Sequence, residues 1–141
     1  MKAHWIKVFL RLALSMAFLS AVADRFGFWP EEISVWGNMD AFLAYTGSLV
    51  PWAPESLVPF MGWSATILEV LFAVFLILGF KTRLTAQLSG VLLLIFGLSM
   101  VFSFGIKAPL DYSVFSGAAA AFGLSLIKEP FLEVDQLIGK K

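Results

Sequence analysis

The chain has 141 residues, of which 60% are hydrophobic and 14% charged, with a formal net charge of zero and a mean hydropathy of +0.87. A soluble domain needs a substantially polar surface, so this composition excludes a soluble globular protein and predicts an integral membrane protein. The sequence contains no cysteine, which excludes disulfides, thiolate metal sites and cysteine nucleophiles. Its single histidine, His4, stands at the N-terminus, and we predict no metal site.

Four apolar segments predict membrane-spanning helices, at about residues 6–23, 57–78, 86–104 and 112–127. We therefore expect one all-α membrane domain, a four-transmembrane-helix bundle. The first segment also resembles a signal peptide, because it follows lysines and ends in Ala21-Val22-Ala23. Since Arg11 interrupts its apolar stretch, we expect this segment to be retained as the first helix.

The basic residues predict the orientation of these helices. Cytoplasmic loops carry an excess of lysine and arginine. With a cytoplasmic N-terminus, most basic residues fall inside and only two fall outside, Arg25 and Lys107. The inside set is Lys2, Lys7, Arg11, Lys81, Arg83, Lys128, Lys140 and Lys141. We expect both termini to be cytoplasmic.

The long connection between the first two spans, residues 24–56, predicts a lid at the outer boundary. Asn38 is a suitable N-cap for a short amphipathic helix over about residues 38–46, and Gly47 is a suitable end for it. Aromatic residues gather in and near this connection, where we expect an interfacial aromatic belt, with a ligand-gripping cage as the alternative. The candidate outer-face residues are Trp36, Asn38, Tyr45, Trp52, Asp111 and Tyr112.

Glu69 is the first candidate for a functional site, because it lies alone in the middle of the second apolar segment. A charged group at this depth costs several kcal/mol and usually faces the interior of a bundle, a partner charge or a water-filled cavity. The alternative is a structural glutamate that only fixes helix packing. Small residues on its face, Ala65 and Ala73, favour an inward direction, as Gly90 and Gly97 do for the third span.

Two arginines of the first span are candidate partners for Glu69. Antiparallel packing of the first two spans predicts that Arg11 lies nearest in depth, with Arg25 as the second choice. Asp24 and Arg25 at the outer mouth are then expected to pair with each other, with Asp111 or with the lid, while lipid headgroups are the alternative partner of Arg25. The predicted intramembrane polar site is Glu69, Arg11, Arg25 and Asp24.

The order of several short motifs resembles that of the DoxX family. These motifs are Arg11 in the first helix, Arg25 after it, the acid in Ile67-Leu68-Glu69-Val70, and the run Leu78-Gly79-Phe80-Lys81-Thr82-Arg83-Leu84-Thr85-Ala86. The chain departs from the family where Ala23-Asp24-Arg25-Phe26-Gly27 replaces the usual glycine and lysine. The resemblance implies a four-helix protein of the bacterial cytoplasmic membrane, and some members are associated with quinone-linked sulfur oxidation or oxidative-stress complexes.

Three classes of function follow from these residues and the resemblance. The first is a redox-associated subunit with a polar pocket for quinone or another lipophilic molecule, working with a membrane or peripheral oxidoreductase. The second is a binding or transport module for a small solute, and the third is a structural or assembly subunit. We expect no intrinsic cofactor, with quinone as the candidate ligand. The lipid bilayer is the expected surrounding and a homo-oligomer an open alternative, with no nucleic-acid partner.

Overall fold

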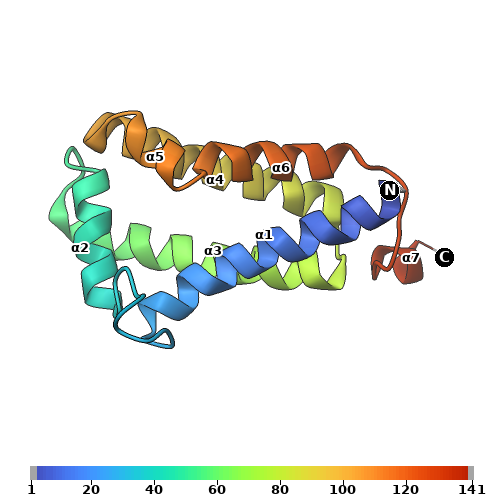
Figure 1. The fold of residues 1–141 in the computed structure, drawn as a ribbon, viewed down its shortest axis with the longest axis horizontal. Helices are drawn as coiled ribbons and strands as arrows, with labels where there is room; N and C mark the ends of the chain where they lie inside the picture. Colours follow the sequence, from blue (N-terminus) through green and yellow to red (C-terminus); the bar gives the residue numbers. More distant parts are fainter. Residues whose placement is uncertain (1–2, 140–141) are drawn as a thin grey trace.

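The computed structural model describes residues 3–139, and this part of the chain is helical without any strand. Figure 1 shows the longer helices running lengthwise beside one another, with α2 across one end. The elements in chain order are α1 (Ala3–Arg25), α2 (Met39–Leu49), η1 (Glu55–Leu57), α3 (Val58–Leu78), α4 (Thr82–Phe104), α5 (Lys107–Asp111), α6 (Val114–Leu126) and α7 (Asp135–Ile138).

Three helical segments are long and apolar enough to cross a membrane, namely Ala3–Arg25, Glu55–Leu78 and Thr82–Phe104. These three indicate a multi-pass membrane protein. The fourth predicted span is shorter than expected, because α6 has only 13 residues and is separated from α5 by Ser113, whose φ is +56°. At a rise of 1.5 Å per residue, α6 is about 20 Å long, less than the hydrocarbon thickness of about 30 Å.

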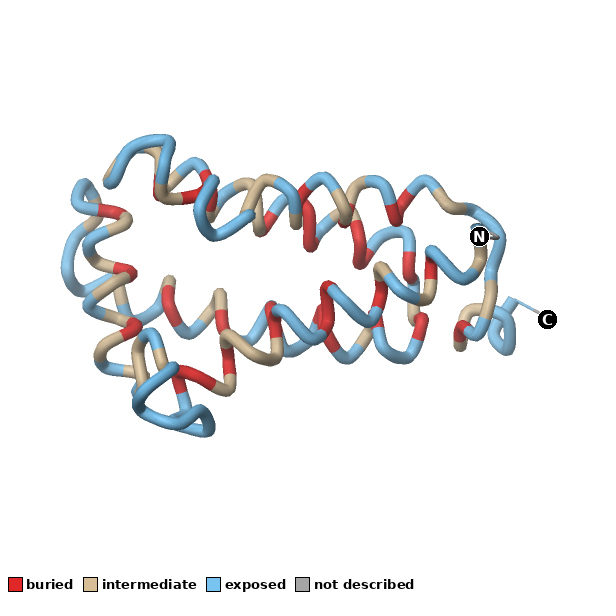
Figure 2. The backbone as a smooth tube through the Cα atoms, viewed as in Figure 1, coloured by how far each residue is buried: buried red, intermediate tan, exposed pale blue. Residues whose placement is uncertain are grey.

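The side chains follow the pattern of a protein surrounded by lipid. Many large apolar residues point away from the helices' shared interior, including Phe9, Met16, Ile67 and Phe102, the last of which is 87% exposed. Buried positions recur between exposed ones along each long helix (Figure 2). Since lipid is as apolar as a leucine side chain, the helices associate by close packing rather than by hiding apolar surface.

The closest packing joins α4 to α6. A Cβ atom on Gly90 would lie 2.8 Å from the ring of Phe122, and one on Gly97 would lie 2.7 Å from the ring of Phe115. Each glycine of α4 therefore receives a phenylalanine ring of α6. This agrees with the expectation that these two glycines share a contact face.

The two ends of the molecule are named by what they hold (Figure 1). The tail end holds the start of α1 and α7, and the opposite, lid end holds α2. At the tail end, residues 127–139 fold back as a tail across the junction of α3 and α4. Gly79 ends α3 with φ +69°, and a Cβ there would lie 2.6 Å from the backbone of Glu133. Glycine is therefore required both for the left-handed turn and for the approach of the tail.

The tail also decides where α4 begins. The carboxylate of Asp135 accepts hydrogen bonds from the backbone N–H groups of Lys81, at 2.7 Å, and of Thr82, at 3.0 Å. These are groups that a helix start leaves without an intrahelical partner. The sequence predicted a start near residue 86, and α4 begins four residues earlier because this cap comes from a distant segment.

At the lid end, residues 26–54 form the lid, which contains α2. Asn38 accepts a hydrogen bond from the backbone N–H of Ala41 at 2.8 Å, as expected for the N-cap of the short helix. The helix continues to Leu49, so the expectation that Gly47 ends it is wrong. Val50, whose N–H bonds to the Thr46 carbonyl, follows as the C-cap. The other predicted helices agree with the structure to within a few residues, with α1 extended at both ends.

Candidate functional site

The centre of the candidate site is an ion pair between Arg25, at the end of α1, and Glu69, in the middle of α3. Both terminal nitrogens of the guanidinium donate to the carboxylate: Nη1 contacts Oε2, and Nη2 lies 3.1 Å from Oε1. Nη1 also donates to the Thr66 hydroxyl at 2.8 Å. Both side chains are 3% exposed. This two-point geometry is the strong form of an arginine–carboxylate contact.

Aromatic rings of the lid cover the opposite side of the guanidinium. The Cζ atom of Arg25 lies 3.7 Å from the ring centre of Phe42 and 5.4 Å from that of Trp36. A cation over an aromatic face is attracted to it, more strongly when water is excluded. Within residues 3–139 the buried Nε of Arg25 has no hydrogen-bond partner. The guanidinium is thus held by a carboxylate, a hydroxyl and two rings, and keeps one N–H donor free.

A cavity of about 830 Å³ adjoins this pair between the helices and the lid. Arg25 and Glu69 line it together with many apolar side chains of α1, α2, α3, α4 and α6, among them Phe18, Leu68 and Phe96. Some lining residues are largely exposed, including Phe60 near the lid and Ile95 in the middle of α4. The cavity is therefore only partly enclosed, and part of its lining lies at the level of the helices, where a membrane would present lipid.

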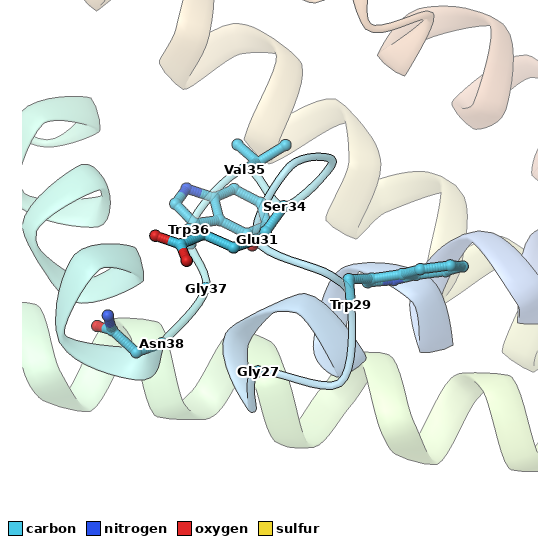
Figure 3. Close-up of a pocket in the computed structure, with 8 residues that line it drawn as sticks. All are labelled: Gly27, Trp29, Glu31, Ser34, Val35, Trp36, Gly37 and Asn38. Carbon is cyan, nitrogen blue, oxygen red and sulfur yellow. The ribbon is translucent and has the colours of Figure 1, made fainter.

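A second, smaller cavity of about 540 Å³ lies within the lid itself (Figure 3). It is lined by loop residues between Gly27 and Asn38, and Figure 3 shows Trp29 lying along α1, apart from the others. Its charged member, Glu31, is exposed, and neither Arg25 nor Glu69 lines it. The larger cavity is the better candidate for a binding site because it combines a buried ion pair with a mostly apolar lining.

The predicted pairing of Arg11 with Glu69 is wrong. The Ser15 hydroxyl lies 2.7 Å from the Arg11 carbonyl of its own helix and 3.0 Å from the Ala73 carbonyl, so positions 15 and 73 are level in the antiparallel helices. In that register Arg11 lies level with position 77, about 12 Å along α3 from Glu69, whereas Arg25 lies level with position 63, about 9 Å away. Arg25 is therefore the nearer of the two arginines, and its side chain reaches the carboxylate.

Arg11 instead lies among backbone carbonyls at the tail end, and four of its five guanidinium N–H groups donate to them. Its nitrogens donate to Leu76 at 2.8 Å and Ile77 at 2.9 Å, the last turn of α3. They also donate to Phe131 at 3.1 Å and Leu132 at 2.9 Å in the tail. The carbonyls at a helix end lack intrahelical donors, so this arginine caps α3 and fastens the tail.

Asp24 is bound to the lid rather than to Arg25 or Asp111. Its carboxylate accepts hydrogen bonds from the hydroxyl of Ser34 and from the backbone N–H groups of Val35, Trp36 and Gly37, the last three at 2.8, 3.3 and 3.1 Å. Of the three expected partners of Asp24, namely Arg25, Asp111 and the lid, the structure shows the lid. Asp111 forms an exposed pair with Lys107 at 2.5 Å.

The predicted outer-face residues divide into two groups. Trp36, Tyr45 and Tyr112 line the larger cavity, with Trp36 packed 5.7 Å from the ring of Tyr45. Asn38 is used as a helix cap, and Trp52 is 78% exposed and contributes nothing to that cavity. Burial raises the pKa of the Tyr45 phenol above its ordinary value, and the neighbouring Tyr112 phenol adds to the rise. The Tyr45 hydroxyl is therefore a neutral donor at physiological pH.

The structure adds participants that sequence reasoning did not assign to the site. Thr66 stands three residues before Glu69, a spacing that shares a helix face and that would have been a usable signal. Phe42 is a second such participant, since its ring lies against the guanidinium of the ion pair. At the tail end, Lys7 forms a buried pair with Glu133 at 2.8 Å, for which the sequence holds no local signal. Across residues 3–139 there is no cluster of three or more potential metal-ligating acids, histidines or cysteines.

Comparisons with known proteins found no matching family model, no matching curated protein and no matching solved structure. The resemblance to the DoxX family therefore stays a prediction, carried by the short motifs in this sequence.

Proposed function

We propose that this protein is a four-helix protein of the bacterial cytoplasmic membrane that binds a lipophilic small molecule of the quinone class beside the Arg25–Glu69 pair. In this proposal α6 and its flanking residues complete the fourth crossing. The observation that carries the proposal is a buried ion pair that lines a large, partly enclosed apolar cavity at the level of the helices. An apolar cavity with a few convergent polar groups is the usual form of a small-molecule site.

The chemistry of the cavity favours a neutral ligand with carbonyl acceptors. The charges of Arg25 and Glu69 compensate each other, and the carboxylate of Asp24 is occupied by four donors of the lid. Asp24 keeps its negative charge, and within residues 3–139 no unpaired cation remains beside the cavity to attract an anionic ligand. The hydroxyl of Tyr45, a residue that lines the cavity, is a suitable donor for a carbonyl oxygen, while the apolar wall accommodates a ring and hydrocarbon tail.

Electron transfer to such a ligand requires a second protein in this proposal. The chain contains no cysteine, and its motifs indicate no haem or dinucleotide site. We therefore assign it the role of a quinone-binding subunit that works with a membrane or peripheral oxidoreductase. The resemblance to the DoxX family supports this assignment, since some members of that family are associated with quinone-linked oxidation.

Binding of decylubiquinone to the purified protein in detergent tests this function. Glu69→Gln keeps the shape of the side chain but removes the charge that holds Arg25, so we expect affinity to fall about tenfold or more. Glu55→Gln, an exposed change near the lid, is the matched control and should bind like the wild type. If the wild type does not bind, the proposal fails. Unchanged binding by Glu69→Gln would make the carboxylate structural and favour an assembly subunit.

The proposed orientation places both termini in the cytoplasm. It is supported by the positive-inside pattern and by the position of Ala3, the α3–α4 junction and the tail at one end of the molecule (Figure 1). Reporters active only in the cytoplasm should work when inserted at Lys81 or fused after Lys141, and should not work near Glu55. Reporter activity near Glu55 would reverse the orientation.

A further inference from the structure

Two adjacent charged residues end α1 and point to different parts of the molecule. Asp24 is 5% exposed and Arg25 is 3% exposed, so both are buried. Successive residues of a helix differ in direction by about 100°. Arg25 consequently turns inward to Glu69, whereas Asp24 turns to the loop that follows α1.

Asp24 gathers the loop around one carboxylate. Three consecutive backbone N–H groups, from Val35 to Gly37, and the Ser34 hydroxyl all donate to it. The loop closes tightly beside it, because Gly27 has φ +72° and a Cβ there would lie 3.1 Å from the Gly37 carbonyl oxygen. Charge-assisted bonds of this kind are about twice as strong as neutral ones. The loop is thus tied back to the helix that carries Arg25.

Trp36 is the residue whose position this contact decides. Its backbone N–H is one of the donors to Asp24, and its ring packs 5.1 Å from the Phe42 ring and 5.4 Å from the Arg25 guanidinium. Trp36 also lines the larger cavity. The path of contacts therefore runs from Asp24 through the backbone of residues 35–37 to the ring that covers the ion pair.

We propose that Asp24 is a positioning residue of the ligand site, which latches the lid so that Trp36 covers Arg25 and closes the lid end of the cavity. What this means for a ligand rests on the proposed function. The latch itself is a property of the protein without ligand, so it can be tested separately. The carboxylate acts through Trp36 and contacts no ligand of its own in this scheme.

The experiment uses a protein in which Trp5, Trp29, Trp52 and Trp63 are replaced by phenylalanine, leaving Trp36 as the fluorescent reporter, in lipid nanodiscs. Acrylamide in the water should quench Trp36 weakly. Asp24→Asn replaces one acceptor oxygen with a donor, so we expect quenching to rise severalfold. Asp40→Asn, an exposed acid on α2, is the control and should leave quenching unchanged.

Ser34→Ala removes one of the four donors and should raise quenching less than Asp24→Asn, which keeps the test decisive even if that variant folds poorly. Hydrogen exchange in α3 and α4 should be unchanged in both variants, which separates a released lid from general unfolding. The latch would be overturned if Trp36 stayed protected from acrylamide in Asp24→Asn or in Ser34→Ala. It would also be overturned if Asp40→Asn raised quenching as much as those variants do.

A second measurement tests the effect on a ligand. Where decylubiquinone binds the wild type, it should dissociate faster from Asp24→Asn, and an unchanged rate would overturn the positioning role. Failure of the wild type to bind defeats the proposed function alone.

Discussion

At the tail end α1 buries Arg11, and at the lid end it buries Arg25, each 4% exposed or less. Arg11 donates to four backbone carbonyls that belong to α3 and to the tail. Arg25 contacts one carboxylate, one hydroxyl and two aromatic rings, and it borders a cavity. Arg11 therefore holds chain segments together, whereas Arg25 and its partner Glu69 form part of the wall of a cavity.

The difference shows how the same residue type takes a structural or a candidate functional role. Backbone carbonyls cannot move away without unwinding a helix end or displacing the tail, so the four N–H groups of Arg11 that bind them are fixed in place. Side-chain partners can rotate, exchange protons or be replaced by a ligand, so the surroundings of Arg25 are adjustable. Burial of a charge in a membrane helix is therefore weaker evidence for a binding site than the kind of partner that the charge has.

The largest effect that this comparison predicts is for Arg11→Met. The change removes a donor from four backbone carbonyls. It also removes a cation from Glu133, whose carboxylate lies 3.9 Å from the Arg11 guanidinium and keeps Lys7 as its partner. We therefore expect the free energy of unfolding to fall by about 5 kcal/mol. Arg83→Met, an exposed change at the same end, should cost far less. Denaturation in mixed detergent micelles measures both. Similar losses for the two variants would remove the distinction between a capping arginine and a surface arginine.

A smaller loss is predicted at the lid end. Arg25→Met leaves Glu69 buried and unpaired, which should lower the free energy of unfolding by about 3 kcal/mol, less than for Arg11 because the cavity gives the acid access to the surroundings. Adding Glu69→Leu should recover part of that loss, since the stranded charge is removed as well. A double variant no more stable than Arg25→Met alone would show that the ion pair is not the main contact of this arginine.

The smallest effect concerns the cap that the tail supplies to α4. Asp135→Asn keeps one acceptor for the N–H groups of Lys81 and Thr82 but loses the negative charge at the helix start, which should cost about 1 kcal/mol. Glu129→Gln, an exposed acid of the tail, should have no comparable effect. Thermal unfolding followed by circular dichroism measures the difference. Binding at the lid end should be the same in both variants, because Asp135 lies at the other end.

Composition and local pattern were sufficient for much of the fold. Long apolar runs predict helices wherever they occur, and Asn38 is recognisable as a helix cap because that role depends on neighbouring residues alone. The candidate importance of Glu69 likewise follows from one fact about the sequence, a carboxylate in the middle of an apolar run. Its burial inside the molecule agrees with that expectation.

Only the tertiary structure decided which arginine meets Glu69, where α4 starts and what the tail does. Each depends on contacts between residues far apart in the chain: the register that places Ser15 level with Ala73, the cap supplied by Asp135, and the pairing of Lys7 with Glu133. The sequence by itself determined that charged groups would be buried among these helices, because a charged side chain within an apolar run must turn away from lipid. Their partners were decided by helix register, which small shifts in packing change without changing the pattern of hydrophobic residues.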